Sequence, residues 1–159
     1  DVACPTIAMW LATKIRAEDL ATPDHDGNTP LHLAAMYNEL KTIPLHTDKQ
    51  KTLRIANRPS LVLLVEAAPQ VAVMRNNVGR LPVHCAIVSG KAFMNGIVQL
   101  IHANPACLNQ RDSLTLLPPC LLAATVPSCR LSTAFELLRL CPEIVQQGIK
   151  QSNDEMSVE

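Results

Sequence analysis

Apolar residues recur at helical spacing in four separate segments of the chain. In residues 8–15, apolar side chains occupy positions i, i+3, i+4 and i+7, which places them on one face of a helix. Similar stripes recur in residues 60–68, 94–101 and 131–138. A proline follows each segment, and proline cannot continue a helix because it lacks the backbone N–H. The pattern therefore predicts an all-α fold built from short helices.

A second kind of helix start is predicted where a proline closely follows a turn. Gly27 marks the turn, since glycine adopts a positive φ without steric cost. Thr29 then supplies an N-cap hydroxyl, and Pro30 suits the first helical position, where its missing N–H costs nothing. Residues 24–35, DHDGNTPLHLAA, thus combine a turn, a cap and a helix start.

This combination recurs twice further along the chain, with progressive loss of its parts. In the second copy Gly79 again stands three residues before Pro82, but Leu81 replaces the capping threonine, so we expect a weaker helix start. The third copy, residues 115–124, has neither the glycine nor the histidine that follows the proline. Its helix starts at Pro118 or Pro119, and a one-residue change in the turn would explain both alignments.

The spacing of the prolines shows a regular repeat. Pro69 and Pro105 are 36 residues apart, as are Pro82 and Pro118, and Pro142 follows Pro105 by 37. With its T-P-L-H-L-A-A motif, the chain resembles the ankyrin-repeat family, whose usual period is 33. The resemblance implies an all-α solenoid of stacked helix-turn-helix repeats. It covers residues 7–148, as a half-repeat (7–22) and three repeats (24–69, 76–105 and 111–145), followed by a flexible tail (149–159).

Composition excludes several classes of function. The 159 residues are 48% hydrophobic and 18% charged, which is typical of a folded domain, and no apolar run is long enough to cross a membrane. The formal net charge is zero, so no global field attracts nucleic acid. An insertion at 39–58 is locally basic but holds no aromatic residue to stack bases, which leaves a mobile loop or weak nucleic-acid binding as its interpretations.

Reactive side chains do not form a recognisable catalytic or metal site. His32 and His84 occupy the same place in their repeats, so we interpret both as structural residues. Cys85 adjoins His84, but neighbours on a helix point about 100° apart and cannot form a Cys–His pair. The six cysteines form no C-x-x-C motif and are expected to be buried free thiols in a reducing compartment. We therefore expect no enzyme activity, no cofactor and no metal, and an intracellular, cytoplasmic location without a signal peptide.

The ankyrin resemblance implies a non-catalytic scaffold that binds another protein, with no small-molecule substrate and no membrane insertion. Partner contacts are expected at the turn tips and on the concave helix face. Met36 and Tyr37 are the predicted anchors, and Tyr37→Ala and Arg80→Ala are expected to weaken partner capture without changing the melting temperature. An alternative is a regulatory or targeting arm of a larger multidomain protein with its catalytic part elsewhere. The full predicted set is Asp24, His25, Asp26, Asn28, Met36, Tyr37, Asn76, Asn77, Arg80, Val88, Ser89, Arg111 and Asp112.

Overall fold

The computed structural model describes residues 18–37 and 59–144, and every regular element in these two ranges is helical. The all-α prediction is therefore confirmed for the described part of the chain. The predicted helix at 8–15, most of the half-repeat, the insertion at 39–58 and the tail lie outside the described residues. The elements, in chain order, are η1 (Asp19–Ala21), α2 (Pro30–Met36), α4 (Ser60–Ala67), η2 (Pro69–Val73), α5 (Pro82–Val88), η3 (Phe93–Ile97), α6 (Val98–Ala103), η4 (Pro105–Asn109), α7 (Pro119–Thr125) and α8 (Leu131–Leu140).

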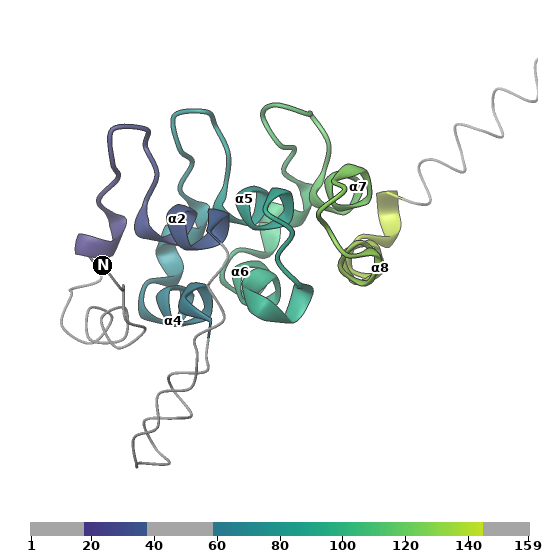
Figure 1. Ribbon diagram of the computed structural model, residues 1–159, viewed down its shortest axis with the longest axis horizontal. Coiled ribbons are helices and arrows are strands. Elements are labelled where there is room, and N and C mark those ends of the chain that lie inside the picture. Colours follow the sequence, from purple (N-terminus) through teal and green to yellow (C-terminus); the bar gives the residue numbers. More distant parts are fainter. Residues whose placement is uncertain (1–17, 38–58, 145–159) are drawn as a thin grey trace, which may run out of the picture.

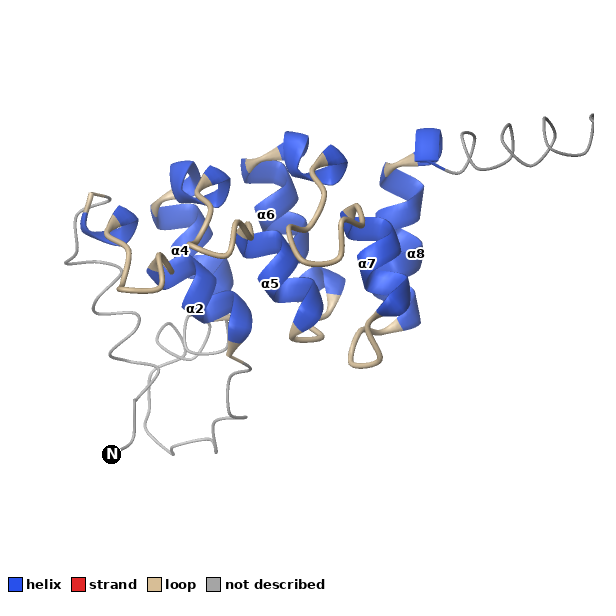
Figure 2. Cartoon of the chain, turned by 90° about the horizontal axis from the view of Figure 1, so that it is seen from above, coloured by secondary structure: helices blue, strands red, loops and turns tan. Residues whose placement is uncertain are grey.

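The helices form a row of three pairs: α2 with α4, α5 with α6, and α7 with α8 (Figures 1 and 2). We call these pairs units 1, 2 and 3. An extended loop precedes the first helix of each unit, and the three loops rise side by side in Figure 1. We call them finger 1 (residues 22–29), finger 2 (74–81) and finger 3 (110–118).

The predicted helices match the observed ones closely. The 60–68 stripe is α4, and the 131–138 stripe lies in α8. The 94–101 stripe is split between the wide turn η3 and α6, because Asn95 and Gly96 (φ +118°) have non-helical backbone angles inside η3. A Cβ at Gly96 would overlap the side chain of Leu61 in unit 1, so the absence of a side chain at Gly96 allows close approach of the two units.

The structure decides the register of the third repeat. α7 begins at Pro119, and Leu116, three residues earlier, has φ +58°, where the first two fingers have Gly27 (φ +76°) and Gly79 (φ +85°). The N–H of Leu116 bonds to the carbonyl of Asp112, a span one residue longer than the equivalent Gly79-to-Asn76 bond in finger 2. The expected one-residue change in the turn is therefore present.

The core lies between the helix layers and continues from unit to unit. Its fully buried side chains are mostly aliphatic, in keeping with the scarcity of aromatic residues in the sequence. Helices this short are not stable alone, so their stability comes from packing against neighbours. The largest buried aliphatic residues are Leu31, Leu61, Leu81, Ile87, Ile97, Leu100, Leu122 and Leu137.

Candidate functional site

Finger 1 folds on its own hydrogen bonds. The carboxylate of Asp24 accepts the backbone N–H groups of Asp26 (3.0 Å) and Asn28 (2.8 Å), and Gly27 closes the turn with its positive φ. Desolvation acts to raise the pKa of Asp24, but these N–H groups outweigh it and the pKa is lowered. The acidic tip is thus ionised and geometrically defined.

Finger 2 is bound to finger 1 along its length. The side chain of Asn76 donates to that of Asn28 at 2.9 Å in a buried contact, and both residues are under 10% exposed. Nearer the tip, the N–H of Asn77 donates to the carbonyl of Asp26 at 3.0 Å, and its side-chain amide donates to the carbonyl of His25 at 2.9 Å. The two loops therefore form one connected layer.

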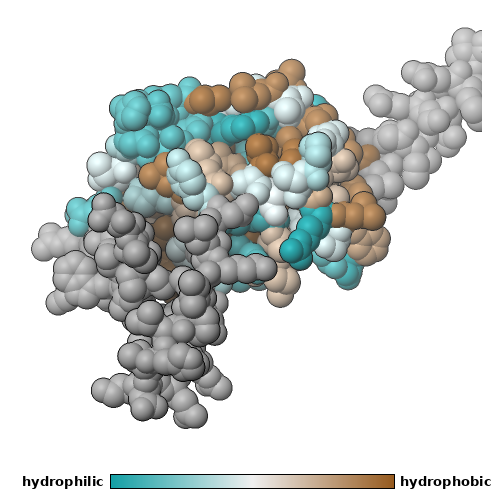
Figure 3. Space-filling model, viewed as in Figure 1, coloured by the Kyte–Doolittle hydropathy of each residue, from teal (hydrophilic) through white to brown (hydrophobic). Residues whose placement is uncertain are grey.

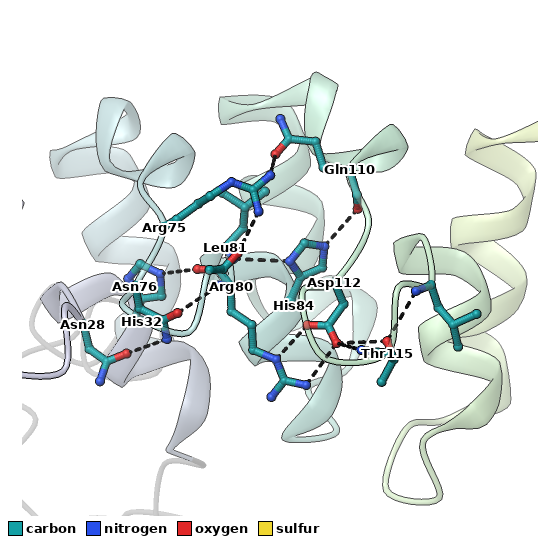
Figure 4. A network of polar contacts seen from close by, with 12 residues as sticks. Asn28, His32, Arg75, Asn76, Arg80, Leu81, His84, Gln110, Asp112 and Thr115 are labelled. Carbon is teal, nitrogen blue, oxygen red and sulfur yellow. Dashed lines mark hydrogen bonds and ion pairs between the residues drawn. The ribbon is translucent and has the colours of Figure 1, made fainter.

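Two buried histidines each join a helix start to the next finger (Figure 4). Nδ1 of His32 accepts the N–H of Thr29 at 3.3 Å, while its Nε2 lies 3.1 Å from the carbonyl of Arg80. His84 repeats the arrangement with the N–H of Leu81 (3.2 Å) and the carbonyl of Gln110 (3.0 Å). Because Nδ1 faces a donor and Nε2 an acceptor, we assign both rings as neutral with the proton on Nε2.

The histidine contacts confirm the structural interpretation of His32 and His84 and modify the expectation for the second helix start. The Thr29 hydroxyl lies 2.9 Å from Nδ1 of His32, so its replacement by Leu81 in unit 2 removes one hydroxyl contact. The backbone N–H of Leu81 still reaches His84, as that of Thr29 reaches His32. Burial lowers the pKa of both imidazoles, since desolvation penalises the charged ring.

Fingers 2 and 3 are joined by an ion pair whose acidic partner is fully buried. Nε and Nη2 of Arg80 donate to the two oxygens of Asp112 at 2.7 and 3.1 Å. The N–H and hydroxyl of Thr115 donate to the same carboxylate at 3.0 and 2.9 Å. Burial alone would raise the pKa of Asp112, but the bonds from Arg80 and Thr115 lower it to about 2.

The predicted site residues differ in burial, and some of them are not available to a partner. Asn28, Asn76 and Asp112 are buried, and Arg80 is committed to Asp112 with only 18% of its side chain exposed. We therefore replace the expectation that Arg80→Ala leaves the melting temperature unchanged with an expected loss of stability. Exposed residues are Asp24, His25, Asp26, Tyr37, Asn77 and Arg111, and half-buried ones are Met36, Val88 and Ser89.

Finger 3 presents apolar residues that the sequence reasoning did not include. Leu114 and Leu116 are 63% and 64% exposed, in contrast to the acidic tip of finger 1. Figure 3 shows this change from hydrophilic to hydrophobic surface along the row of fingers. Counting back from Pro119 rather than Pro118 would have placed Leu116 at the turn position.

Cys85 and His84 do not form a nucleophile–base pair. Burial raises the pKa of Cys85 to about 11, and His84 bonds to backbone atoms of Leu81 and Gln110. Cys85 is therefore protonated near neutral pH and unsuited to nucleophilic attack. Asp24, His25 and Asp26 bring potential metal ligands within 4.8 Å of one another, but all three are exposed and their proximity follows from the turn.

One of the comparisons with known proteins gives a match. The family model described as Ankyrin repeat matches residues 26–46, which include the tip of finger 1 and α2. No curated protein and no solved structure gives a significant match. Within residues 18–37 and 59–144, none of the helices has the length and apolar character to cross a membrane. The match confirms the ankyrin resemblance, and its described part, residues 26–37, belongs to a fold whose described elements are all helical.

Proposed function

We propose that the chain is a non-catalytic protein-binding module whose partner lies across the fingers and the adjoining helix face. The supporting observation is that the inner and outer side chains of the fingers differ in burial. Their inner polar groups bond to one another in a buried layer, while their outer side chains remain exposed. A surface held in place before binding has less conformational entropy to lose, which favours affinity.

The chemistry of the exposed residues suits an extended macromolecular partner. Finger 1 offers Asp24 and Asp26, finger 3 offers Arg111 and the apolar Leu114, and Tyr37 is 71% exposed at the end of α2. Acidic, basic, apolar and aromatic side chains spread over neighbouring loops are typical of protein interfaces, in which a few large side chains contribute most of the affinity. Tyr37 and Leu114 are our proposed anchors.

The test compares substitutions on this surface with one away from it. Partners are captured by photo-crosslinking from the native source, identified by mass spectrometry and then measured for binding in purified form. Tyr37→Ala and Leu114→Ala should each weaken binding at least tenfold with an unchanged melting temperature. Met94→Ala serves as control, because Met94 is also 71% exposed but lies in η3, outside both the fingers and α2. Binding that tolerates both Tyr37→Ala and Leu114→Ala would contradict the proposal.

Nucleic-acid binding through residues 39–58 stays a prediction, because this segment lies outside the described residues. It predicts an affinity that falls steeply with salt and depends on the loop from Lys49 to Arg58. Protein binding through the fingers predicts no dependence on that loop.

A further inference from the structure

Fingers 2 and 3 expose three large apolar side chains at neighbouring turns. Val78 in finger 2 is 49% exposed, and Leu114 and Leu116 in finger 3 are 63% and 64% exposed. The two turns lie close together, because a Cβ added at Gly79 would lie 3.1 Å from the Cβ of Ser113. We call Val78, Leu114 and Leu116 the apolar tip.

The backbone of Leu116 has a conformation that disfavours leucine. Its φ of +58° lies in the left-handed region, and fingers 1 and 2 place Gly27 and Gly79 at the same position. Because most of the Leu116 side chain faces solvent, packing within the fold does not offset this cost. A strained residue with an exposed side chain is typical of a position retained for contact with a partner.

Two arginines with defined positions lie beside the apolar tip. Arg75 donates to the carbonyl of Gly79 at 2.7 Å and to the side chain of Gln110 at 2.6 Å, which joins finger 2 to finger 3 (Figure 4). Arg111 donates to the carbonyl of Leu116 at 3.0 Å. Both arginines are exposed, and hydrogen bonds to neutral oxygens leave their positive charge in place.

The exposed charge of fingers 2 and 3 is therefore positive. The one acidic residue in these two fingers, Asp112, is buried and bonded to Arg80. Finger 1 differs, since Asp24 and Asp26 are exposed at its turn. A partner segment meets basic groups beside the apolar tip and acidic groups at finger 1, so its charge determines where along the row it binds.

We infer that fingers 2 and 3 bind a protein segment in which large apolar side chains lie beside carboxylates. The apolar side chains cover the apolar tip, and the carboxylates pair with Arg75 and Arg111, whose planar guanidinium groups match a carboxylate. The acidic turn of finger 1 repels such a segment and so fixes its place on the row. This inference rests on the proposed protein-binding function and adds the chemistry of the partner.

Selection of random peptides, displayed on phage, against the immobilised full chain tests the inference. The enriched peptides should contain acidic and apolar residues and lack lysine and arginine. The most enriched peptide is then synthesised with a fluorescent label, and its affinity is measured by fluorescence anisotropy. A second peptide with lysine in place of each acidic residue is the matched control. It should bind at least tenfold more weakly, because it brings like charges to Arg75 and Arg111.

Substitutions in the chain assign the bound peptide to this surface. Leu116→Gly and Leu116→Asn should each weaken binding at least tenfold without lowering the melting temperature, since glycine and asparagine both tolerate a positive φ. Arg75→Gln and Arg111→Gln should each weaken binding and reduce its dependence on salt. Leu131→Asn and Arg130→Gln should bind like the wild type, because both residues are exposed at the start of α8, outside the fingers.

Failure of this inference and failure of the proposed function give different results. Enrichment of basic peptides, or no enrichment over the bare support, would overturn the inference. Peptide binding that is lost in Tyr37→Ala but unaffected by the Leu116, Arg75 and Arg111 variants would overturn it as well, while leaving the proposed function standing. The proposed function itself is decided separately, by the partner captured through photo-crosslinking.

Discussion

The two buried histidines predict a loss of stability on mild acidification. His32 and His84 are neutral in the folded chain, with Nδ1 accepting an N–H and Nε2 donating to a carbonyl. Protonation would place a proton on Nδ1 facing a donor and would charge a fully buried ring. Both pKa values therefore lie below the ordinary 6.5.

The direction and the size of this stability change follow from the linkage between proton binding and folding. Since the folded pKa is lowered, the unfolded chain binds more protons near pH 6, and the free energy of unfolding falls as the pH falls below 6.5. Each histidine contributes at most about 1.4 kcal/mol per pH unit, so two of them set an upper limit of about 2.7 kcal/mol between pH 7.5 and 5.5. Asp112 acts in a lower window, because its stabilisation is lost as the pH falls from 3.8 through about 2.

Urea unfolding, followed by circular dichroism at several pH values and constant ionic strength, measures how steeply the free energy of unfolding changes with pH. His32→Gln and His84→Gln should each remove about half of this slope, since glutamine three residues after the N-cap can still accept the N-cap N–H but does not titrate. His102→Gln is the control, because His102 is exposed on α6. Equal stability at pH 7.5 and 5.5, or a slope lost in the His102 variant alone, would refute the neutral-histidine assignment.

Three further substitutions test the fingers by their effect on the free energy of unfolding. Arg80→Ala should cost about 3 kcal/mol in urea unfolding, because it leaves the buried Asp112 carboxylate without its cation; a change below 0.5 kcal/mol would contradict the assigned role. Leu116→Gly should raise the melting temperature, since relief of a left-handed backbone worth about 1–2 kcal/mol exceeds the added entropy of glycine in the unfolded chain; a lower melting temperature would speak against it. Gly27→Ala should lower the melting temperature, because it combines a positive φ with overlap of Asn77; an unchanged melt would mean that finger 1 is not bound to finger 2 as described.

The helices were predictable from sequence because their signals are local. Stripes of apolar residues, closing prolines and the repeated position of His32 and His84 all lie within single repeats. Whether the polar finger residues are buried or exposed was not predictable in the same way. Asn28 and Asn76 are 48 positions apart, and their pairing depends on how closely two loops approach. A polar residue in a turn looks the same in sequence whether it faces solvent or a neighbouring loop.

The exposure of apolar residues in unit 3 could not be predicted from sequence for a related reason. Leu121 and Phe135 read as ordinary helix residues, and whether such a side chain is covered depends on the presence of a neighbouring unit. The third turn was also obscure, because Leu116 in a left-handed conformation carries none of the signal that glycine provides.

The polar bonds between fingers also determine how disorder would spread through the molecule. Among the described residues, the side-chain bonds that cross between fingers join finger 1 to finger 2 or finger 2 to finger 3. Such a system behaves as a linear array with nearest-neighbour coupling, in which an end can fray while the rest stays folded. Finger 2 cannot fray in this way without affecting its neighbours, because it takes part in both junctions. Loss of order there would remove the finger bonds of both junctions at once and leave the units joined by the core that continues between them and by bonds such as that of Ser89 to the carbonyl of Ala35.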